Sequence, residues 1–575
     1  MMRWRRAIPD WMTDYQQSWL TSDIGAGAAT WAVLVPLSLS IAAIAGVDPV
    51  VGLYTFPLAL VGYAIFGGQR VLVVGPDAAV AILSGSIVAS IADGKEEFLA
   101  LTIALAFIVG LLYILFYFLK MGWAADLVPD PVLKGFTEGI IWLTLLKQSV
   151  ALFGLAPDEK PSGTWDLLVY LRHSIFEAHL PAVIIGVLSI ATLIFFRMFL
   201  PRWPSPLIVL VGSIAISSLL GLNGLGVTVL GVVEGGLPKI ALPTDLDSDH
   251  IITLLSGALA IVLLGYTKAL PPLKRAAEYS GDRLEPNREL LALGAANIGA
   301  GMGGGHALSA SLTATSINIG AGGKTQVGNL FAGLLCVLTI LFLLPLLRNL
   351  PLSSLAAIIM VALGGVSNLG YFHGLWQISR YEFLVAVAAF VGVLAFGVLP
   401  GVVIGVVLAF FKLAYAIHEP VTATVGRTPS GGFVDIDEYP EAVEIPGMVI
   451  LHQYGPLVFL NARILADALR KATQVDRSIQ VVVLDATASS GIDSSAADKI
   501  ASVRDELAEA GIALWVVNPR QRGWKIVESL LMVKGVAIPR VFDTIQDAIA
   551  AFENPFGSDA IEVAAAKNDV AKNKT

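Results

Sequence analysis

Two stretches rich in glycine combine the residue types that could hold an anion. They read GGQRVLVVGPDAAV at 67–80 and NIGAGMGGGHALSAS at 297–311, and each leads into a short apolar segment. Glycine and β-branched residues before a short span are typical of a half-helix that follows an extended strand. Such a helix N-terminus presents free N–H groups and about half a positive charge. The pattern predicts an anion site, although glycines in membrane helices also allow close packing.

Asp77 and Lys268 are the charged residues that bear most directly on such a site. Asp77 precedes the first short segment, where an acid suits the helix dipole but repels an anion unless it is protonated or paired. A charge near mid-membrane costs at least ~2.5 kcal/mol, so the two should pair if both face the site. We expect anion binding to compete with or rearrange this pair, with Asp77 as the candidate for proton coupling. Lys268 can instead snorkel to the interface beside Lys274 and Arg275.

Other reactive side chains indicate no catalytic centre. Glu138 and Lys147 lie nine residues apart in one apolar segment, about two and a half helical turns, which favours interdomain pairing or polar packing. His306 has either a structural role or one in pH sensing. Cys336 is the single cysteine, which excludes a disulfide framework, a cysteine-based zinc site and a thiol redox pair within one chain. No nucleophile–base set or metal cluster is evident, so we expect neither an enzyme nor a bound cofactor or metal.

The composition places these residues in a membrane. The chain has 575 residues, of which 14% are charged and 56% are hydrophobic, whereas a soluble protein carries roughly 25% charged residues. A mean hydropathy of +0.75 and long apolar stretches indicate a polytopic membrane protein in contact with lipid. The net charge of -8 argues against a nucleic-acid partner.

Residues 21–418 are predicted to form the transmembrane domain, preceded by a cytoplasmic leader at 1–20. A span needs about 20 apolar residues, or fewer where it is broken. The candidate spans are fourteen: Ser22–Ala45, Pro49–Phe66, Ala78–Ala92, Phe98–Leu119, Val132–Phe153, Pro181–Phe199, Pro206–Leu222, Ile251–Leu270, Arg288–Ala300, Ala307–Ile319, Thr325–Leu347, Pro351–Leu369, Tyr381–Val398 and Gly401–Ile417.

The short spans are the third and the tenth, which are equivalent positions in two inverted repeats of seven. Their N-termini would then meet near the bilayer midplane. An even number of spans puts both termini on one side, and Arg3, Arg5 and Arg6 make that side cytoplasmic by the positive-inside rule. We therefore expect a multi-pass protein of the inner (plasma) membrane with both termini in the cytoplasm.

The remaining chain predicts a linker at 419–440, a soluble domain at 441–554 and a disordered tail at 555–575. Apolar runs in MVILHQY, IQVVVLDAT and IALWVVN alternate with helical patterns. This order indicates an α/β sandwich with helices on a mixed sheet. Asp493 precedes a helix there, so it is expected to cap that helix.

Several segments resemble the signature segments of the SulP anion transporter (sulfate permease) family. They are VPLSLSIAAIAGVDPVVGLY, FGGQRVLVVGPDAAVAIL, VLKGFTEGI, EPNRELLALGAANIGAGMGGG and NIGAGGKTQVGNLFAG. The soluble part, with YGPLVFLNA and VVVLDATASSGIDSSAADKI, resembles that family's STAS domain. The resemblance covers about Trp19 to Phe552.

The resemblance implies the uracil-permease-like fold of fourteen segments in two inverted repeats, divided into core and gate, and a homodimer. It implies a secondary transporter that moves a small anion by an elevator-like motion. Sulfate is the default substrate, followed by bicarbonate or a C4-dicarboxylate. The alternative is a membrane regulator whose STAS domain recruits a cytoplasmic protein partner and which transports little.

The resemblance also places the anion between the third and tenth spans and against the first. The residues it assigns to the site are Pro36, Ser38, Ser40, Gly75, Pro76, Asp77, Ala78, Ala79, Lys268, Ala307, Leu308, Ser309, Ala310, Ser311 and Thr313. The bacterial relatives of the STAS domain are phosphorylated at a serine that corresponds to Ser494, which makes this residue a regulatory candidate.

Four positions depart from the family pattern. Leu37 and Ile41 stand where relatives commonly have Gln and an aromatic residue, and Ala314 stands where many have Arg. Lys268 occupies the place of a carboxylate that relatives use for sodium or proton coupling. Sodium coupling is therefore less expected than proton coupling, and Lys268 can supply the positive charge that Ala314 lacks.

Overall fold

The computed structural model describes most of the chain. The described residues are 9–127, 129–155, 163–200, 203–231, 248–364, 367–418, 422–475, 478–489, 491–519, 521–533 and 539–553. The tail predicted at 555–575 lies outside them, as do the first eight residues of the predicted leader. The described residues divide at 409/410 into two compact units, which are treated separately below.

The first unit is helical, with helices at nearly all the predicted spans. Among its described residues, six helices are long and apolar enough to cross a membrane. The principal helices are α2 Leu20–Ala45, α3 Pro49–Phe66, α4 Ala78–Ala89, α5 Lys95–Phe118, α6 Asp130–Leu152, α8 Leu180–Phe199, α9 Ser205–Leu220, α10 Ser248–Ser280, α11 Pro286–Met302, α12 Leu312–Gly320, α13 Gln326–Leu338, α14 Leu344–Leu347, α15 Leu352–Gly364, α17 Arg380–Phe396 and α18 Val398–His418. The number of crossings and the inverted repeat stay predictions.

Two predicted bounds differ most from the structure. The span expected to end at Leu270 continues to Ser280, with Pro271 and Pro272 inside α10. The span expected to begin at Ala307 begins at Leu312, because the residues before it include a short strand, β2 Ser309–Ala310. Pattern reading also missed two short helices, α7 Thr164–Ser174 and α16 Gly370–Ile378, which are too short and mixed to look like spans.

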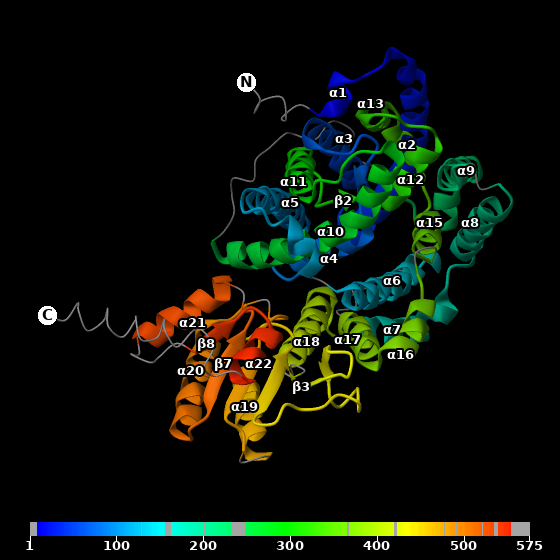
Figure 1. Ribbon diagram of the computed structural model, residues 1–575. Helices are drawn as coiled ribbons and strands as arrows, with labels where there is room; N and C mark the ends of the chain where they lie inside the picture. Colours follow the sequence, from blue (N-terminus) through cyan, green and yellow to red (C-terminus); the bar gives the residue numbers. More distant parts are fainter. Residues whose placement is uncertain are drawn as a thin grey trace. The chain divides into compact units, whose positions relative to one another are not determined.

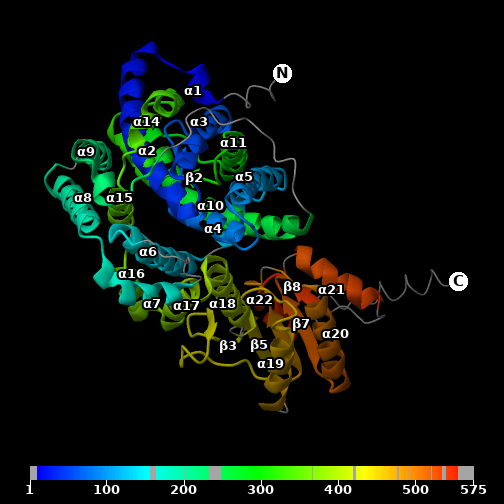
Figure 2. The same ribbon diagram turned by 180° about the vertical axis from the view of Figure 1, so that it is seen from behind.

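The helices of the first unit pack as two groups. In one group, α2, α3, α4, α5, α10, α11, α12 and α13 contact one another; in the other, α6, α8, α9, α15, α16 and α17 do so. Both ribbon views place α8, α9 and α15 at one edge and α3, α5 and α11 away from it (Figure 1, Figure 2). Contacts between the groups run mainly through α2 and α4. We call them the first and second helix groups.

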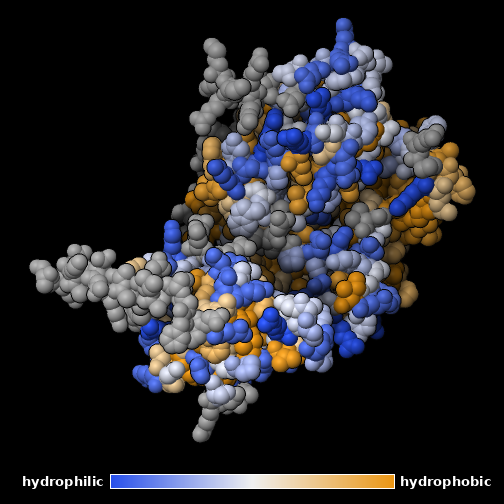
Figure 3. Space-filling model, viewed as in Figure 1, coloured by the Kyte–Doolittle hydropathy of each residue, from blue (hydrophilic) through white to orange (hydrophobic). Residues whose placement is uncertain are grey.

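Large apolar side chains cover the outside of the second group. On α8 and α9 the exposed ones include Ile184, Leu188, Phe195, Val211 and Leu219. Figure 3 shows an orange surface over these helices. An apolar patch of this extent is stable against lipid tails and not against water.

The second unit is an α/β domain with a mixed sheet, as the sequence predicts. The strand order is β4-β3-β5-β6-β7-β8, antiparallel at β3 and β4 and parallel from β5 onward. The strands are β3 Thr422–Arg427, β4 Phe433–Asp435, β5 Met448–Gln453, β6 Val481–Asp485, β7 Ala513–Val517 and β8 Arg540–Phe542, and the helices are α19 Ala462–Val475, α20 Ser494–Glu509, α21 Gln521–Val533 and α22 Ile545–Glu553. Strands β3 and β4 lie within the stretch predicted as a linker, 419–440.

Alternate residues of the central strand β6 face opposite layers. Val482 and Leu484 pack with α19 and α20, whereas Val481 and Val483 pack with α22. All five residues of this strand are buried, because helices cover both faces of the sheet.

Replacing Gly85 with alanine tests the close packing inside the first helix group. A Cβ at Gly85 of α4 would lie 2.2 Å from the carbonyl oxygen of Ala45 on α2, so the backbones must separate. We expect Gly85→Ala to destabilise the protein by about 1–3 kcal/mol, measured as a lower midpoint of thermal unfolding in detergent.

The matched control is Gly212→Ala in α9, where a Cβ would have no atom within 4 Å. It should leave the midpoint unchanged or raise it, because alanine is the better helix former. Equal midpoints for Gly85→Ala and the wild type would contradict the packing described here.

Candidate anion-binding site

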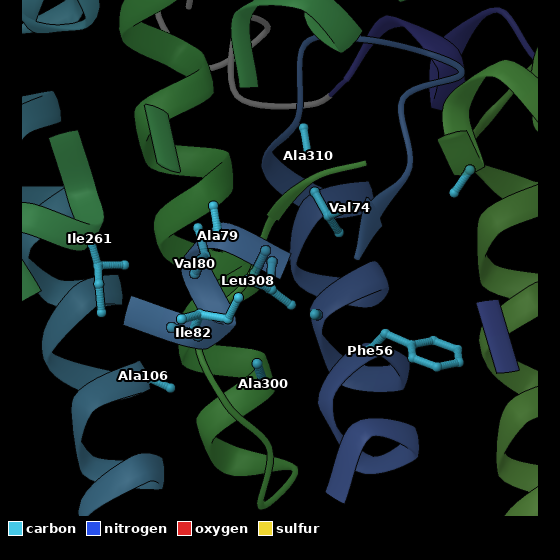
Figure 4. Close-up of a cluster of buried hydrophobic side chains, with 14 of the residues drawn as sticks. Phe56, Val74, Ala79, Val80, Ile82, Ala106, Ile261, Ala300, Leu308 and Ala310 are labelled. Atoms are coloured by element: carbon cyan, nitrogen blue, oxygen red, sulfur yellow. The ribbon is translucent and has the colours of Figure 1, made fainter. Parts of the chain in front are cut away.

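Two short strands bring the N-termini of α4 and α12 together. Strand β1, Val74–Gly75, pairs antiparallel with β2, with Val74 opposite Ala310 and Gly75 opposite Ser309. The amide of Ser311 donates to the carbonyl of Val73 at 2.9 Å and extends the pairing. Figure 4 shows Val74 and Ala310 on these two segments, above the first turns of α4. The predicted arrangement of an extended strand before each short helix is therefore present.

Side chains from α12 and α13 satisfy the backbone of the extended residues that lead into β1. The Asn318 and Asn329 amides donate to the carbonyls of Val71 and Leu72 at 2.8 and 2.7 Å, and Thr315 Oγ1 accepts from the amide of Val73 at 3.1 Å. These polar side chains are fully buried. Extended backbone inside a membrane needs such partners, because lipid offers none.

The Asp77 carboxylate caps α4 and occupies the amides that were predicted to bind the anion. Its Oδ1 accepts from the amides of Ala79 and Val80 at 3.0 and 3.1 Å. The carboxylate therefore sits where a bound oxyanion would profit from the helix dipole. An anion can use these amides only if the Asp77 side chain moves away.

The N-terminus of α12 is more open. Ser311 Oγ accepts from the amide of Ala314 at 3.3 Å. No hydrogen bond within the described part of the chain engages the amides of Leu312 and Thr313, whose side chains are exposed. This helix end can offer two amides and the Thr313 hydroxyl to an anion without rearrangement.

Lys268 lies against Asp77, as expected if both face the site. Its Nζ is 3.7 Å from Asp77 Oδ2, and the two side chains are 22% and 20% exposed. Since α10 continues twelve residues beyond Lys268, the backbone of Lys268 lies about 18 Å along the helix axis from the last residue of the helix. The structure thus favours the site over the interface for Lys268.

Residues 307–309 support the site without presenting their side chains to it. The Ser309 hydroxyl, a predicted ligand, donates to the carbonyl of Gly265 on α10 at 2.7 Å and is fully buried. The amide of Leu308 donates to Asn297 Oδ1 at 3.0 Å, and Ala307 is also buried. The first contact fixes β2 against α10, one turn before Lys268, and the second fixes the residue before β2 against α11.

The first span, α2, packs closely against β1 and forms one side of the candidate site. Leu34 of α2 approaches Gly75, where a Cβ would be 3.2 Å from the leucine Cδ2. Ser40 Oγ donates to the carbonyl of Pro36 in the same helix at 2.7 Å. Ser38 Oγ is buried and has no hydrogen-bond partner among the described residues. Of the three predicted residues of this span, Ser38 alone has a hydroxyl left for another group.

Tyr113 of α5 is a polar residue near the site that sequence reasoning missed. A Cβ added at Gly265 would lie 2.7 Å from Tyr113 Oη and 3.9 Å from Ser309 Cβ. The hydroxyl is fully buried and has no hydrogen-bond partner in the described structure. No signal distinguishes this tyrosine in the sequence, because it is one aromatic residue in a long apolar helix.

The remaining charged candidates lie elsewhere. Glu138 accepts a hydrogen bond from Ser367 Oγ at 2.8 Å and another from the amide of Asn368, so it serves polar packing rather than an ion pair with Lys147. His306 is buried, with Nδ1 2.8 Å from the carbonyl of Ala307. Among the described residues no group of His, Cys, Asp or Glu is arranged to hold a metal ion. In the second unit, Asp493 caps α20, with Oδ1 accepting from the amide of Ala496 at 2.8 Å, and the adjacent Ser494 is exposed.

Comparison with known proteins finds a matching family for each of the two units. Residues 20–389 match the Sulfate permease family, and residues 439–548 match the STAS domain. The chain is 28% identical to "Probable sulfate transporter MT1781" of Mycobacterium tuberculosis over 545 residues, covering 94% of this chain and 96% of that protein.

Two solved structures share the fold. The murine anion transporter Slc26a9 in the inward-facing state has a TM-score of 0.88 at 22% identity, covering 95% of this chain and 94% of its own. The transmembrane domain of the cyanobacterial bicarbonate transporter BicA has a TM-score of 0.59 at 23% identity, covering 68% of this chain and 98% of its own.

A double-mutant cycle tests the pair of Asp77 and Lys268. Asp77→Asn and Lys268→Gln each leave one partly buried charge without its partner, whereas the double variant leaves none. We expect each single variant to unfold at a lower temperature than the wild type and the double variant to recover part of the loss, with a coupling of about 1 kcal/mol. Strictly additive effects would show that the pair contributes nothing to stability.

Proposed function

Because the chain belongs to the sulfate permease family, we propose that it is a secondary active transporter of a small oxyanion, with sulfate as the first candidate. The proposal is supported by the full-length similarity to a sulfate transporter and by a site built from two opposed helix N-termini and one lysine. Helix ends suit an oxyanion because amide donors and dipoles bind it without a full charge for each oxygen.

The observation that carries the mechanism is the position of the Asp77 carboxylate. It holds two amides of α4 and lies 3.7 Å from the ammonium of Lys268. A substrate anion would use the same amides and the same ammonium, so carboxylate and substrate compete. Protonation removes the charge of Asp77 and lets the anion take its place, which couples one proton to each anion bound. Lys268 occupies the place of the carboxylate that serves cation coupling in relatives, so sodium is not required.

The division into two helix groups suits transport by an elevator. Both helix ends of the site, together with Lys268 on α10, belong to the first group. This group can move as one body past the second and carry the anion with it. We propose that the first group is the moving core and the second the fixed gate, in a homodimer of the cytoplasmic membrane with both termini inside.

Uptake into proteoliposomes tests the transport activity itself. Labelled sulfate, bicarbonate, chloride and fumarate are compared, each with and without inward proton and sodium gradients. We expect sulfate uptake above that of protein-free vesicles, stimulated by the proton gradient and indifferent to sodium. Failure with every anion would overturn the proposed function, and preference for bicarbonate or fumarate would replace sulfate as the substrate.

Asp77→Asn tests proton coupling. The amide keeps its oxygen for capping α4 but cannot bind or release the coupling proton. We expect the variant to lose the stimulation of uptake by an inward proton gradient while exchange of labelled for unlabelled anion continues. Asp93→Asn, at an exposed acid after α4, is the matched control and should keep the stimulation. Full dependence on the gradient in Asp77→Asn would remove Asp77 from this role.

A further inference from the structure

A cavity lies between the two helix groups, apart from the strands and caps of the site above. It has a volume of about 90 Å³, and its polar lining consists of Thr144, Lys147 and Gln148 of α6. Ala43 and Ile44 of α2 and Ile82 of α4 form the opposite wall. One water needs about 10–15 Å³ on this scale, so the cavity can hold several waters or a partly hydrated oxyanion.

The cavity contacts α4 about one turn after that helix begins. Ile82 is four residues after Ala78, the first residue of α4, which is about 6 Å along the helix axis. The other lining residues lie near the C-terminal ends of α2 and α6, which are Ala45 and Leu152. With the predicted cytoplasmic termini, these ends are on the outer side of the membrane. The cavity therefore lies on the path between the outer solution and the anion site.

Lys147 gives this cavity a positive charge that nothing nearby neutralises. Within the described ranges no carboxylate lies within ion-pair distance of Lys147, and its side chain is exposed. Glu138, the other charge on α6, is nine residues away, about 13.5 Å along the helix, and is already bonded to residues 367 and 368. An unpaired ammonium at membrane depth is costly unless water or an anion reaches it.

Hydrogen-bond donors accompany the charge. Thr144 lies three residues and Gln148 one residue from Lys147, so a hydroxyl and an amide join the ammonium at the same cavity. Together they match the acceptor oxygens of an oxyanion, whereas the facing wall is apolar and offers no competing carboxylate.

We propose that Lys147, with Thr144 and Gln148, forms an outer recruitment site that draws the anion from solution before it reaches α4 and α12. This inference rests on the proposed transport of anions. Lys147 belongs to the second helix group, so the recruitment site stays with the gate while the core carries the anion away. Its charge raises the local concentration of anion and so lowers KM, with little effect on the later steps.

Uptake kinetics from the outer side give the first test. We expect Lys147→Gln to raise KM about tenfold with kcat nearly unchanged, and Lys147→Arg to stay within about twofold of the wild type. The matched control is Lys95→Gln, an exposed lysine at the start of α5 on the same predicted side, which should behave as the wild type does. A KM for Lys147→Gln equal to that of the Lys95→Gln control would overturn the recruitment site.

A labelling experiment needs no transport and so separates this inference from the proposed function. The one native cysteine, Cys336, is buried, so Gln148→Cys introduces a single reactive thiol into the cavity. Its reaction rates with an anionic and a neutral thiosulfonate reagent are compared with and without Lys147→Gln. We expect Lys147→Gln to slow the anionic reagent about tenfold and leave the neutral one unchanged.

Failure of the proposed transport function and failure of the recruitment site would give different results. If no anion is transported but Lys147 still accelerates the anionic reagent, the proposed function fails and the anion-attracting cavity stands. If the ratio of the two labelling rates does not depend on Lys147, or the thiol reacts with neither reagent, the inference is wrong even where transport is intact.

Discussion

The pairing of two short strands at membrane depth is the constraint on which the rest of the first unit depends. Extended backbone has unpaired N–H and C=O groups, and inside a bilayer each one without a partner costs several kcal/mol. Strands β1 and β2 satisfy one another, and buried Asn318 and Asn329 satisfy carbonyls of the extended residues before β1. Glycine at position 75 allows a close approach of α2, because a Cβ there would lie 3.2 Å from Leu34 Cδ2. Only with both strands held in this way can two helices begin in the interior of the protein.

The N-termini of α4 and α12 create a positive region that favours an anion. In this chain the carboxylate of Asp77 supplies that negative charge. The Asp77 carboxylate caps α4, and Lys268 stands 3.7 Å away. In the proposed mechanism, an anion that binds the α4 amides exchanges with the Asp77 carboxylate, whereas the N-terminus of α12 is open to it. Such an exchange links the charge state of one carboxyl group to occupancy of the site, which is the physical basis for coupling anion movement to a proton.

Much of this architecture could be predicted from the sequence, because a lipid bilayer restricts the backbone structures that a chain can adopt. Apolar length placed α3 at its observed bounds, and the glycine-rich stretches indicated both strands before α4 and α12. The start of α12 was placed five residues early, since Ala307–Ala310 is as apolar as a helix and only its pairing with β1 makes it extended. Tyr113 and the cavity at Lys147 could not be predicted, because both depend on which faces of distant helices meet.

The exchange of Asp77 for a substrate anion can be measured directly as proton uptake by the purified protein. Sulfate is added to the wild type in weakly buffered detergent solution near neutral pH, and a pH indicator reports protons taken up while calorimetry reports anion bound. If the ionised Asp77 carboxylate gains a proton when the anion displaces it, the account predicts close to one proton taken up per anion bound, and none in Asp77→Asn. Stoichiometric anion binding by the wild type without proton uptake would contradict the exchange of Asp77 for the substrate anion.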